Sequence, residues 1–165
     1  MDELEQLAML EADDCGPEAI CSAVAKTFGV KKTEVALLEV AGSLLRFLHP
    51  AELRTMGVIP LSSSAVAART ARTKRAELFN SFTRVQHSSV FEVVRLGDAE
   101  AQGEVIQKLM SAPVFSPADE VLAVIQVSRK AKSTAKAGPD FAPEDLGKLK
   151  SVAVTVGTLL ARSKA

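Results

Sequence analysis

Two long apolar segments near the end of the chain constrain its fold more than any other feature of the sequence. They are IQKLMSAPVF at residues 106–115 and EVLAVIQVSRK at residues 120–130, and only the turn Ser116-Pro117-Ala118-Asp119 separates them. Two apolar runs joined by a few turn-forming residues are typical of a β-hairpin. We therefore predict a hairpin here, with its two strands antiparallel.

A second hairpin is predicted closer to the N-terminus. The segment TEVALLEVAGSLLRFLHP contains apolar runs at residues 35–40 and 44–48, which flank Ala41-Gly42-Ser43. Two shorter segments also fit strands. AELFN at residues 76–80 alternates weakly, and GVIPLS contains Pro60, which cannot donate a ladder hydrogen bond and so favours an edge or irregular strand.

Three segments that precede the hairpin of residues 106–130 have the features of helices. Pro17 suits the first position of one helix and Gly29 can close it. Ser64 can cap another, with Lys74 in the turn that follows it. The predicted helices cover residues 2–12, residues 17 to about 28, and residues 65–73.

The C-terminal segment carries conflicting patterns. SVAVTV at residues 151–156 alternates like a strand, but apolar residues recur at three- and four-residue intervals from Leu146 to Leu160. Pro143-Glu144-Asp145 makes a suitable first turn, because acidic side chains favour the positive end of a helix dipole. The length of the periodic stretch favours a helix over residues 144–162.

These elements together predict an α+β fold of one domain. Hairpins require antiparallel pairing, so we expect a central antiparallel sheet of about five or six strands with the N- and C-terminal helices packed on one face. A chain of 165 residues suits one domain with a substantial core. We assign residues 16–165 to this domain and residues 1–15 to an N-terminal helical extension.

Charge and hydropathy exclude several classes of protein. Lys+Arg and Asp+Glu are equal at 20 each, so no net field would steer the chain to nucleic acid or to an anionic membrane. No apolar run approaches the roughly 20 residues that a membrane span needs. The start, Met1-Asp2-Glu3-Leu4-Glu5, is acidic where a signal peptide would be basic. We expect a cytoplasmic protein with no nucleic-acid or membrane partner.

No enzyme or metal motif stands out. Cys15 and Cys21 lack the spacing of a zinc or redox pair, and Cys21 falls on an apolar helical stripe. No cluster of His, Cys and carboxylate side chains has metal-ligand spacing. Ser62–Ser64 lack the glycines of a nucleophile elbow. We therefore predict neither catalysis nor a metal site.

The basic run RTARTKR at residues 69–75 needs a separate interpretation. It contains no aromatic residue on which a base could stack, and the chain has neither Trp nor Tyr, so a solvated helix end fits better than a nucleic-acid site. The alternative is that Arg72 and Thr73 edge a pocket and hold an anionic ligand, since arginine suits carboxylate and phosphate.

Four blocks of the sequence follow one another in this order: ARTKRAELFN, HSSVFE, SAPVF with EVLAVIQVSRK, and DFAPEDLGKLKSVAVTVGTLL. Together they resemble the successive blocks of a GAF domain. The resemblance covers residues 16–162 and implies the sheet described above, with a loop-covered pocket on the face opposite the terminal helices. It also implies a module that regulates an output domain and that dimerises through its terminal helices.

The same resemblance limits the classes of ligand to consider but does not identify the ligand. GAF domains bind cyclic nucleotides, tetrapyrroles, haem or amino-acid-like metabolites, or have no known ligand. This chain has no cysteine between its hairpins, where tetrapyrrole-linking and methionine-sulfoxide-reducing members carry theirs, so we expect neither activity. The family often has Gly where this chain has Lys74, which implies either a positive φ at Lys74 or a reshaped turn. The cofactor stays unidentified.

We predict the pocket between the sheet and residues 80–105, the longest stretch without clear periodicity. Asn80, His87 and Phe91 combine polar groups with apolar surface, as small-molecule sites do. His87 could bond a ligand, ligate haem, or only cap local backbone. His49, at a strand end, is expected at the surface. The full set of predicted ligand-binding residues is Arg72, Thr73, Asn80, His87, Phe91 and Met110.

The leading functional hypothesis is therefore a small-molecule-binding sensory or regulatory domain that signals through a partner protein in trans. The alternative is a ligand-free dimerisation or interaction module of the same fold. In that case bulky side chains such as Phe79, Phe82, Phe91 and Met110 would fill the pocket.

Overall fold

A six-stranded antiparallel sheet forms the centre of the computed structural model, which describes residues 16–49, 58–63, 65–80, 105–131 and 135–164. Its order is β3-β2-β1-β6-β5-β4, and every neighbouring pair is antiparallel. The α+β sheet predicted from the sequence is therefore confirmed. The strands are β1 (Val35–Ala41), β2 (Leu44–His49), β3 (Val58–Pro60), β4 (Glu77–Phe79), β5 (Val105–Phe115) and β6 (Val121–Ala131).

Both predicted hairpins are present. Gly42 turns β1 into β2 with a φ of 65°, a conformation that glycine adopts without strain. The longer β5–β6 hairpin closes where the Ser116 amide donates to the Glu120 carbonyl at 2.7 Å and the Asp119 amide donates to the Ser116 carbonyl at 2.9 Å. β3 lies at one edge of the sheet, as its proline predicted.

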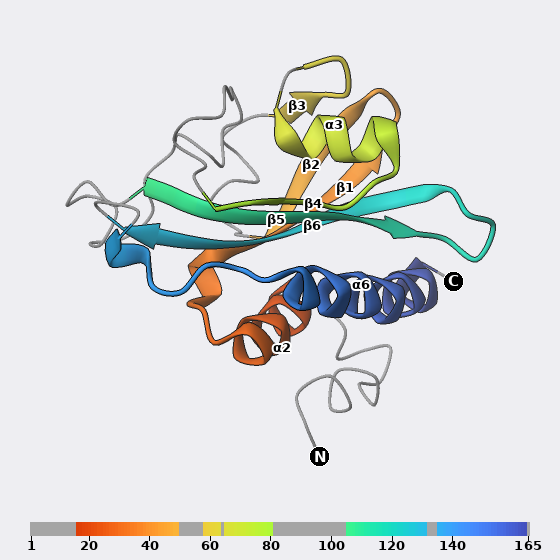
Figure 1. Cartoon of the computed structure of the whole chain (residues 1–165). Coiled ribbons are helices and arrows are strands. Elements are labelled where there is room, and N and C mark those ends of the chain that lie inside the picture. The colour runs from red at the N-terminus through yellow and green to blue at the C-terminus, as the bar shows by residue number, and fades with distance from the viewer. Residues whose placement is uncertain (1–15, 50–57, 64, 81–104, 132–134, 165) are drawn as a thin grey trace.

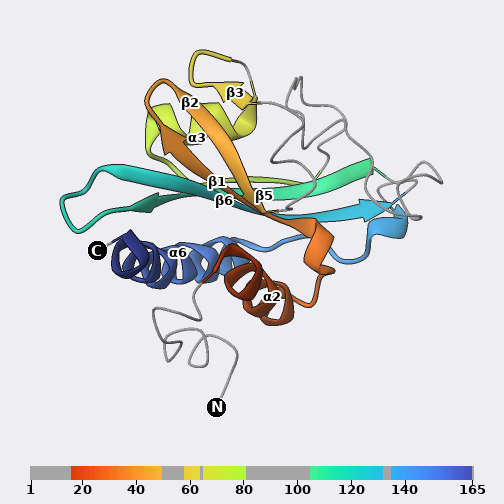
Figure 2. The ribbon, with the colours of Figure 1, turned by 180° about the vertical axis from the view of Figure 1, so that it is seen from behind.

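Helices cover both faces of the sheet unequally (Figures 1 and 2). α2 (Pro17–Phe28) and α6 (Pro143–Lys164) lie side by side beneath one face, and the short α3 (Val66–Thr73) lies on the other. Apolar side chains fill both interfaces, so the core has two layers. Two 3₁₀ turns, η2 (Lys32–Glu34) and η5 (Ala135–Ala137), complete the described elements. The predicted helix over residues 2–12 lies outside the described residues.

The C-terminal segment is a helix, as its periodicity predicted. Leu149, Val152, Val156 and Leu159 are buried against the sheet. Gly157 explains how closely the helix approaches, because a Cβ atom there would lie 2.5 Å from the Phe115 carbonyl oxygen. The stripe of apolar residues on α6 is therefore used inside the monomer.

Helix ends follow the sequence with one exception. Pro17 begins α2, and Gly29 closes it with a φ of 66°, as predicted. The N-cap of α3 is Ala65 rather than Ser64, and no side chain caps this helix. The Ser63 hydroxyl instead accepts a hydrogen bond from the Ala65 amide at 3.1 Å, so the neighbouring serine satisfies part of the helix start.

His49 is buried, which corrects the expectation that it lies at the surface. The pairing of β1 with β2 shifts register between Leu37 and Leu38, and His49 lies opposite Leu37. Its Nε2 lies 3.1 Å from the Lys32 carbonyl oxygen. Burial alternates along β2, and His49 takes the buried position that follows Leu45 and Phe47.

No helix among the described residues is long and apolar enough to cross a membrane.

Candidate functional site

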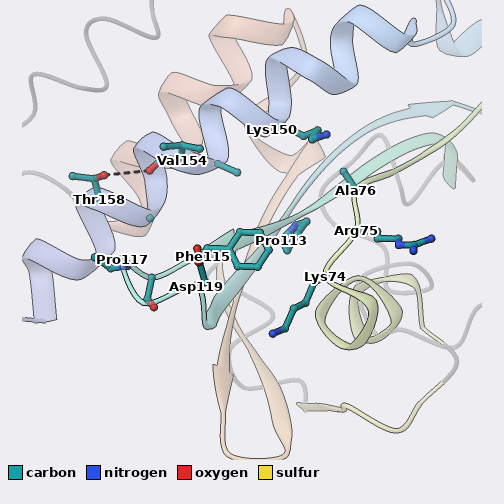
Figure 3. A pocket seen from close by; sticks show the side chains of 13 residues that line it. Lys74, Arg75, Ala76, Pro113, Phe115, Pro117, Asp119, Lys150, Val154 and Thr158 are labelled. Carbon is teal, nitrogen blue, oxygen red and sulfur yellow. Dashed lines mark hydrogen bonds between the residues drawn. The ribbon is translucent and has the colours of Figure 1, made fainter.

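A pocket of about 770 Å³ opens beside α6, where the α3–β4 turn meets the end of the β5–β6 hairpin. We call it the α6 pocket. Figure 3 shows Pro113 and Phe115 between the turn that carries Lys74 and Arg75 and the helix that carries Val154. The lining residues are Lys74, Arg75, Ala76, Pro113, Phe115, Ser116, Pro117, Asp119, Lys150, Ala153, Val154, Gly157 and Thr158.

The α6 pocket exists because β4 is short. β4 pairs with β5 only as far as Ser111, so the part of β5 that contains Pro113 and Phe115 has no described strand beside it on that edge. Pro113 has no N–H and cannot offer a donor there, which protects this open edge from pairing with another chain. The close contact of Gly157 with Phe115 fixes α6 against the same stretch.

The lining of the α6 pocket combines an apolar surface with cations. Lys74, Arg75 and Lys150 are exposed, and none forms an ion pair with a described residue. Asp119 is the one carboxylate among the lining residues. Such a lining can hold an apolar molecule that carries a negative charge.

The hydroxyl groups of the α6 pocket are engaged with the backbone. The Thr158 hydroxyl donates to the Val154 carbonyl at 3.3 Å, and the Ser116 hydroxyl accepts from the Ala118 amide at 3.1 Å. The lining includes no histidine or cysteine that could act as their base. The Thr158 and Ser116 hydroxyls are therefore held by backbone groups of the pocket wall.

The basic run at residues 69–75 divides into two pairs of cations. Arg69 forms a bidentate ion pair with Glu77, whose hydrogen bonds raise the pKa of the Arg69 guanidinium. Arg72 donates to the backbone carbonyls of Leu61 and Ser63. These two arginines thus hold α3 to its neighbours, whereas Lys74 and Arg75 border the α6 pocket.

Lys74 has a left-handed backbone, with a φ of 59°. It closes α3, and its amide donates to the Thr70 carbonyl at 2.9 Å. This is the first of the two alternatives that the sequence left open. Its neighbours Arg72 and Thr73, which we predicted at a pocket edge, are exposed but do not line the α6 pocket.

Asn80 uses both ends of its side-chain amide on one backbone segment. Its Nδ2 donates to the Phe141 carbonyl at 3.0 Å, and its Oδ1 accepts from the Phe141 amide at 2.8 Å. This Asn80 clamp joins the end of β4 to the residues that precede α6. The predicted ligand-binding residue is thus also a structural link between two distant segments.

The segment that Asn80 holds has further attachments. The Lys108 ammonium, almost fully buried, donates to the Asp140 carboxylate at 2.6 Å and to the Gly138 carbonyl at 2.7 Å. The Arg129 guanidinium lies 4.8 Å from the centre of the Phe141 ring, a cation–π contact. The start of α6 is therefore anchored to β4, β5 and β6 together.

A polar network lies between the sheet and α3. Gln126 donates to the Ser111 hydroxyl at 3.2 Å, and Ser111 lies 2.7 Å from the Thr70 hydroxyl. Thr70 also donates to the Val66 carbonyl. All three side chains are buried, on the face where we predicted a ligand. The opposite face, beneath α2 and α6, is mostly apolar.

The other predicted site residues are not brought together. Met110 is fully buried in the apolar layer beneath the helices, so it faces away from α3. Phe79 packs, half-buried, in the layer beneath α3. His87 and Phe91 lie outside the described residues. The described structure therefore does not assemble these side chains into one site.

The α6 pocket itself was not predicted from the sequence. Two features of the sequence lie at it: a proline inside the apolar run of β5, and Lys74 in the turn that follows the predicted helix over residues 65–73. The contributions of Lys150 and Val154 had no sequence signal, because both lie on the exposed side of a helix.

Cys21 is fully buried in the apolar layer beneath the helices. Burial raises the pKa of its thiol, since an apolar environment disfavours the charged thiolate. Within the part of the chain that the structure describes, no three His, Cys, Asp or Glu side chains are placed to hold a metal ion.

Comparison with known proteins supports the fold but not a specific activity. No protein-family model and no curated protein matches the sequence. Among solved structures, the GAF domain of an Acinetobacter phosphoenolpyruvate-protein phosphotransferase superposes with a TM-score of 0.70 at 13% identity, covering 98% of this chain and 92% of that one. Residues 122 to 287 of a methyl-accepting chemotaxis protein give 0.69 at 11% identity, covering 99% and 97%.

An enzyme shares this fold as well. The free methionine-R-sulfoxide reductase from Neisseria meningitidis, solved with its substrate, superposes with a TM-score of 0.68 at 13% identity and covers 98% of this chain and 86% of that one. At such identities the comparison establishes architecture alone. The sheet order, the helix layers and these superpositions together show that the chain has the fold of a GAF domain.

Proposed function

We propose that the chain is a sensory or regulatory domain that binds a small molecule on the α3 side of its sheet and reports it to a partner protein through α6. The same fold serves as a domain of a chemotaxis protein and of a phosphotransferase, which supports a regulatory role. The buried network of Thr70, Ser111 and Gln126 supports a polar floor for a ligand on that side.

The Asn80 clamp is the observation that carries this proposal. Asn80 is the first residue of the segment 80–105, in which we predict His87 and Phe91 to contact the ligand. Phe141, which it grips through two hydrogen bonds, lies two residues before the first residue of α6. A change in the position of Asn80 would therefore displace the start of α6. A ligand causes such a change only if it binds the protein more tightly with Asn80 in the new position than in the old one.

A ligand screen tests the binding half of the proposal. We would measure thermal unfolding of the wild type and of His87→Ala in the presence of nucleotides, tetrapyrroles and amino acids. A ligand that binds only the folded state raises the melting temperature, and His87→Ala should reduce that rise. Ser151→Ala, on the exposed side of α6, serves as the control. A ligand whose effect is the same in all three proteins binds elsewhere.

Native mass spectrometry of protein purified from its own host complements the screen. A retained small molecule supports the proposal directly. If no molecule is retained and no compound shifts the melting temperature, the ligand-free interaction module becomes the better hypothesis.

Hydrogen exchange tests the relay through α6. On addition of a ligand found in the screen, amides in the first turns of α6 should change their exchange rates in the wild type. The change should be lost in Asn80→Ala if the ligand still binds that variant. An equal response in both proteins would show that the Asn80 clamp does not transmit the signal.

A further inference from the structure

We propose that the α6 pocket is a second binding site, and that it takes a small organic anion: a carboxylate, sulfonate or phosphate attached to an apolar body. It borders α6, whereas the polar network lies between the sheet and α3. The two sites share no residue, so the proposal stands independently of the function proposed above.

Val154 and Phe115 supply apolar surface to the α6 pocket. Val154 is 72% exposed, and only it and Val58 are large apolar side chains that the described residues leave exposed. Phe115 and Pro113 face it across the α6 pocket (Figure 3). Exposed apolar surface next to a concavity favours a ligand that removes it from water. A volume of about 770 Å³ is typical of small-molecule pockets, which measure about 300–1,000 Å³.

Three cationic side chains from two parts of the chain border the α6 pocket. Lys74 and Arg75 come from the turn after α3, and Lys150 comes from α6. Elsewhere in the protein, Arg69 and Lys108 are paired with carboxylates, whereas these three have no carboxylate partner among the described residues. An anionic group of the ligand would supply that partner.

Asp119 makes the charge of the α6 pocket uneven from one side to the other. It is the lone acid of the lining and lies in the turn of the β5–β6 hairpin, whereas two of the cations lie on the α3–β4 turn. The anionic group of a ligand should therefore lie toward Lys74 and Arg75, with the apolar body between Phe115 and Val154.

The backbone of Lys74 points to the same conclusion. At a φ of 59° a side chain has a steric cost that the right-handed region does not impose and that glycine avoids. Strained residues cluster at functional sites, where the side chain has a use that offsets the strain. Lys74 borders the α6 pocket, so anion binding would be such a use.

The α6 pocket is also preformed. Gly157 lets α6 touch the Phe115 carbonyl, and the hairpin turn is closed by hydrogen bonds from the Ser116 and Asp119 amides. A ligand would thus find both walls in place, which lowers the entropic cost of binding.

A pair of dyes tests the proposal. 8-Anilinonaphthalene-1-sulfonate carries a sulfonate on an apolar body, and N-phenyl-1-naphthylamine is the same body without the charge. Both fluoresce in apolar sites, and the protein has no Trp or Tyr to interfere. We expect the full-length wild type to bind the sulfonate more tightly than the neutral dye, with an affinity that falls as salt rises.

Three sets of variants locate the site. Replacing Lys74, Arg75 and Lys150 together with Gln should weaken sulfonate binding about tenfold, or about 1.4 kcal/mol, and leave the neutral dye unchanged. Asp119→Asn should tighten sulfonate binding, because Asn retains the left-handed backbone that Asp119 adopts at a φ of 63° and removes the negative charge. Val154→Asp should weaken both dyes, and Ser151→Asp, outside the lining, should affect them much less.

Three outcomes would overturn the proposal. The wild type could bind the two dyes equally or bind neither. The triple variant could retain full sulfonate affinity while remaining folded by circular dichroism. Val154→Asp could change binding no more than Ser151→Asp does, in which case the dye occupies another part of the molecule.

Discussion

The basic residues of the run at 69–75 have different structural roles, although they are close together in the sequence. Within RTARTKR, Arg69 pairs with Glu77, Arg72 binds two backbone carbonyls, and Lys74 ends a helix with a left-handed backbone. A run that reads as one cluster of charge is therefore three separate structural features. The prediction that it binds no nucleic acid is compatible with these contacts, in which Arg69 and Arg72 bind other groups of the same chain.

Lys74→Gly should stabilise the protein. Glycine adopts a φ of 59° without steric cost, and this gain exceeds the added flexibility of the unfolded chain. We expect the free energy of unfolding to rise by roughly 0.5–1 kcal/mol, measured as a higher urea midpoint with an unchanged m-value. The matched control is Arg75→Gly, at an exposed neighbour without a positive φ, which should leave stability the same or lower. If both variants lose stability equally, the Lys74 backbone is not strained.

At the scale of the element, α6 is attached to the sheet both at its start and along its later turns. Its apolar side packs on the sheet, its start is anchored by Asn80 and Lys108, and its later turns contact the end of β5 through Gly157. The two glycines of α6 therefore have opposite significance. Gly157 is required by close packing, whereas Gly147 is exposed, and a Cβ atom added to it would meet open space.

Gly157→Ala and Gly147→Ala should change stability in opposite directions. The first places a Cβ 2.5 Å from the Phe115 carbonyl oxygen, and such overpacking costs typically about 1–3 kcal/mol. The second replaces a poor helix former at an open position and should add up to about 1 kcal/mol. Urea unfolding of the two variants against the wild type measures both. A stable Gly157→Ala variant would mean that α6 can move away from β5 freely.

Asn80→Ala should destabilise the start of α6. The substitution removes two hydrogen bonds to Phe141, each worth about 0.5–1.5 kcal/mol, so we expect a loss of about 1–3 kcal/mol. Asn80→Asp is the matched control, since it keeps the acceptor for the Phe141 amide and loses the donor to its carbonyl. Its stability should fall below that of the wild type, because one hydrogen bond is lost and a carboxylate oxygen then faces the Phe141 carbonyl oxygen. Identical unfolding of all three proteins would contradict the Asn80 clamp.

At the scale of the whole molecule, the two faces of the sheet differ in chemistry. The face beneath α2 and α6 is a broad apolar layer, and the face beneath α3 contains buried hydroxyl and amide groups. Among the described residues, the buried apolar cluster on the first face is the larger of the two. The second face is where the proposed ligand would bind and where polar groups would give it specificity.

Dimerisation through the terminal helices stays a prediction. The structure leaves less apolar surface on these helices for a dimer than the sequence suggested. The apolar stripe of α6 is buried within one chain, so a dimer must use residues 1–15 or the exposed side of the helix. We expect light scattering to give the mass of a dimer at micromolar concentration, and a chain that begins at Gly16 to give that of a monomer. A full-length monomer would refute the prediction.

Local patterns in the sequence were sufficient to determine most of the elements. Apolar runs and the turn residues between them placed both hairpins, and Pro17, Gly29 and the three- and four-residue spacing from Leu146 to Leu160 placed α2 and α6. These features act within a few residues, so they leave a mark on the sequence itself.

The tertiary structure alone decided which distant groups meet. Alternation shows that Met110 and Ser111 face opposite sides of the sheet but not which side the helices cover, so Met110 was predicted at the pocket and is buried beneath the helices. Asn80 and Phe141 are 61 residues apart, and the α6 pocket joins three segments that share no local pattern. Such contacts depend on strand register and helix seating, which the packing of the whole core determines.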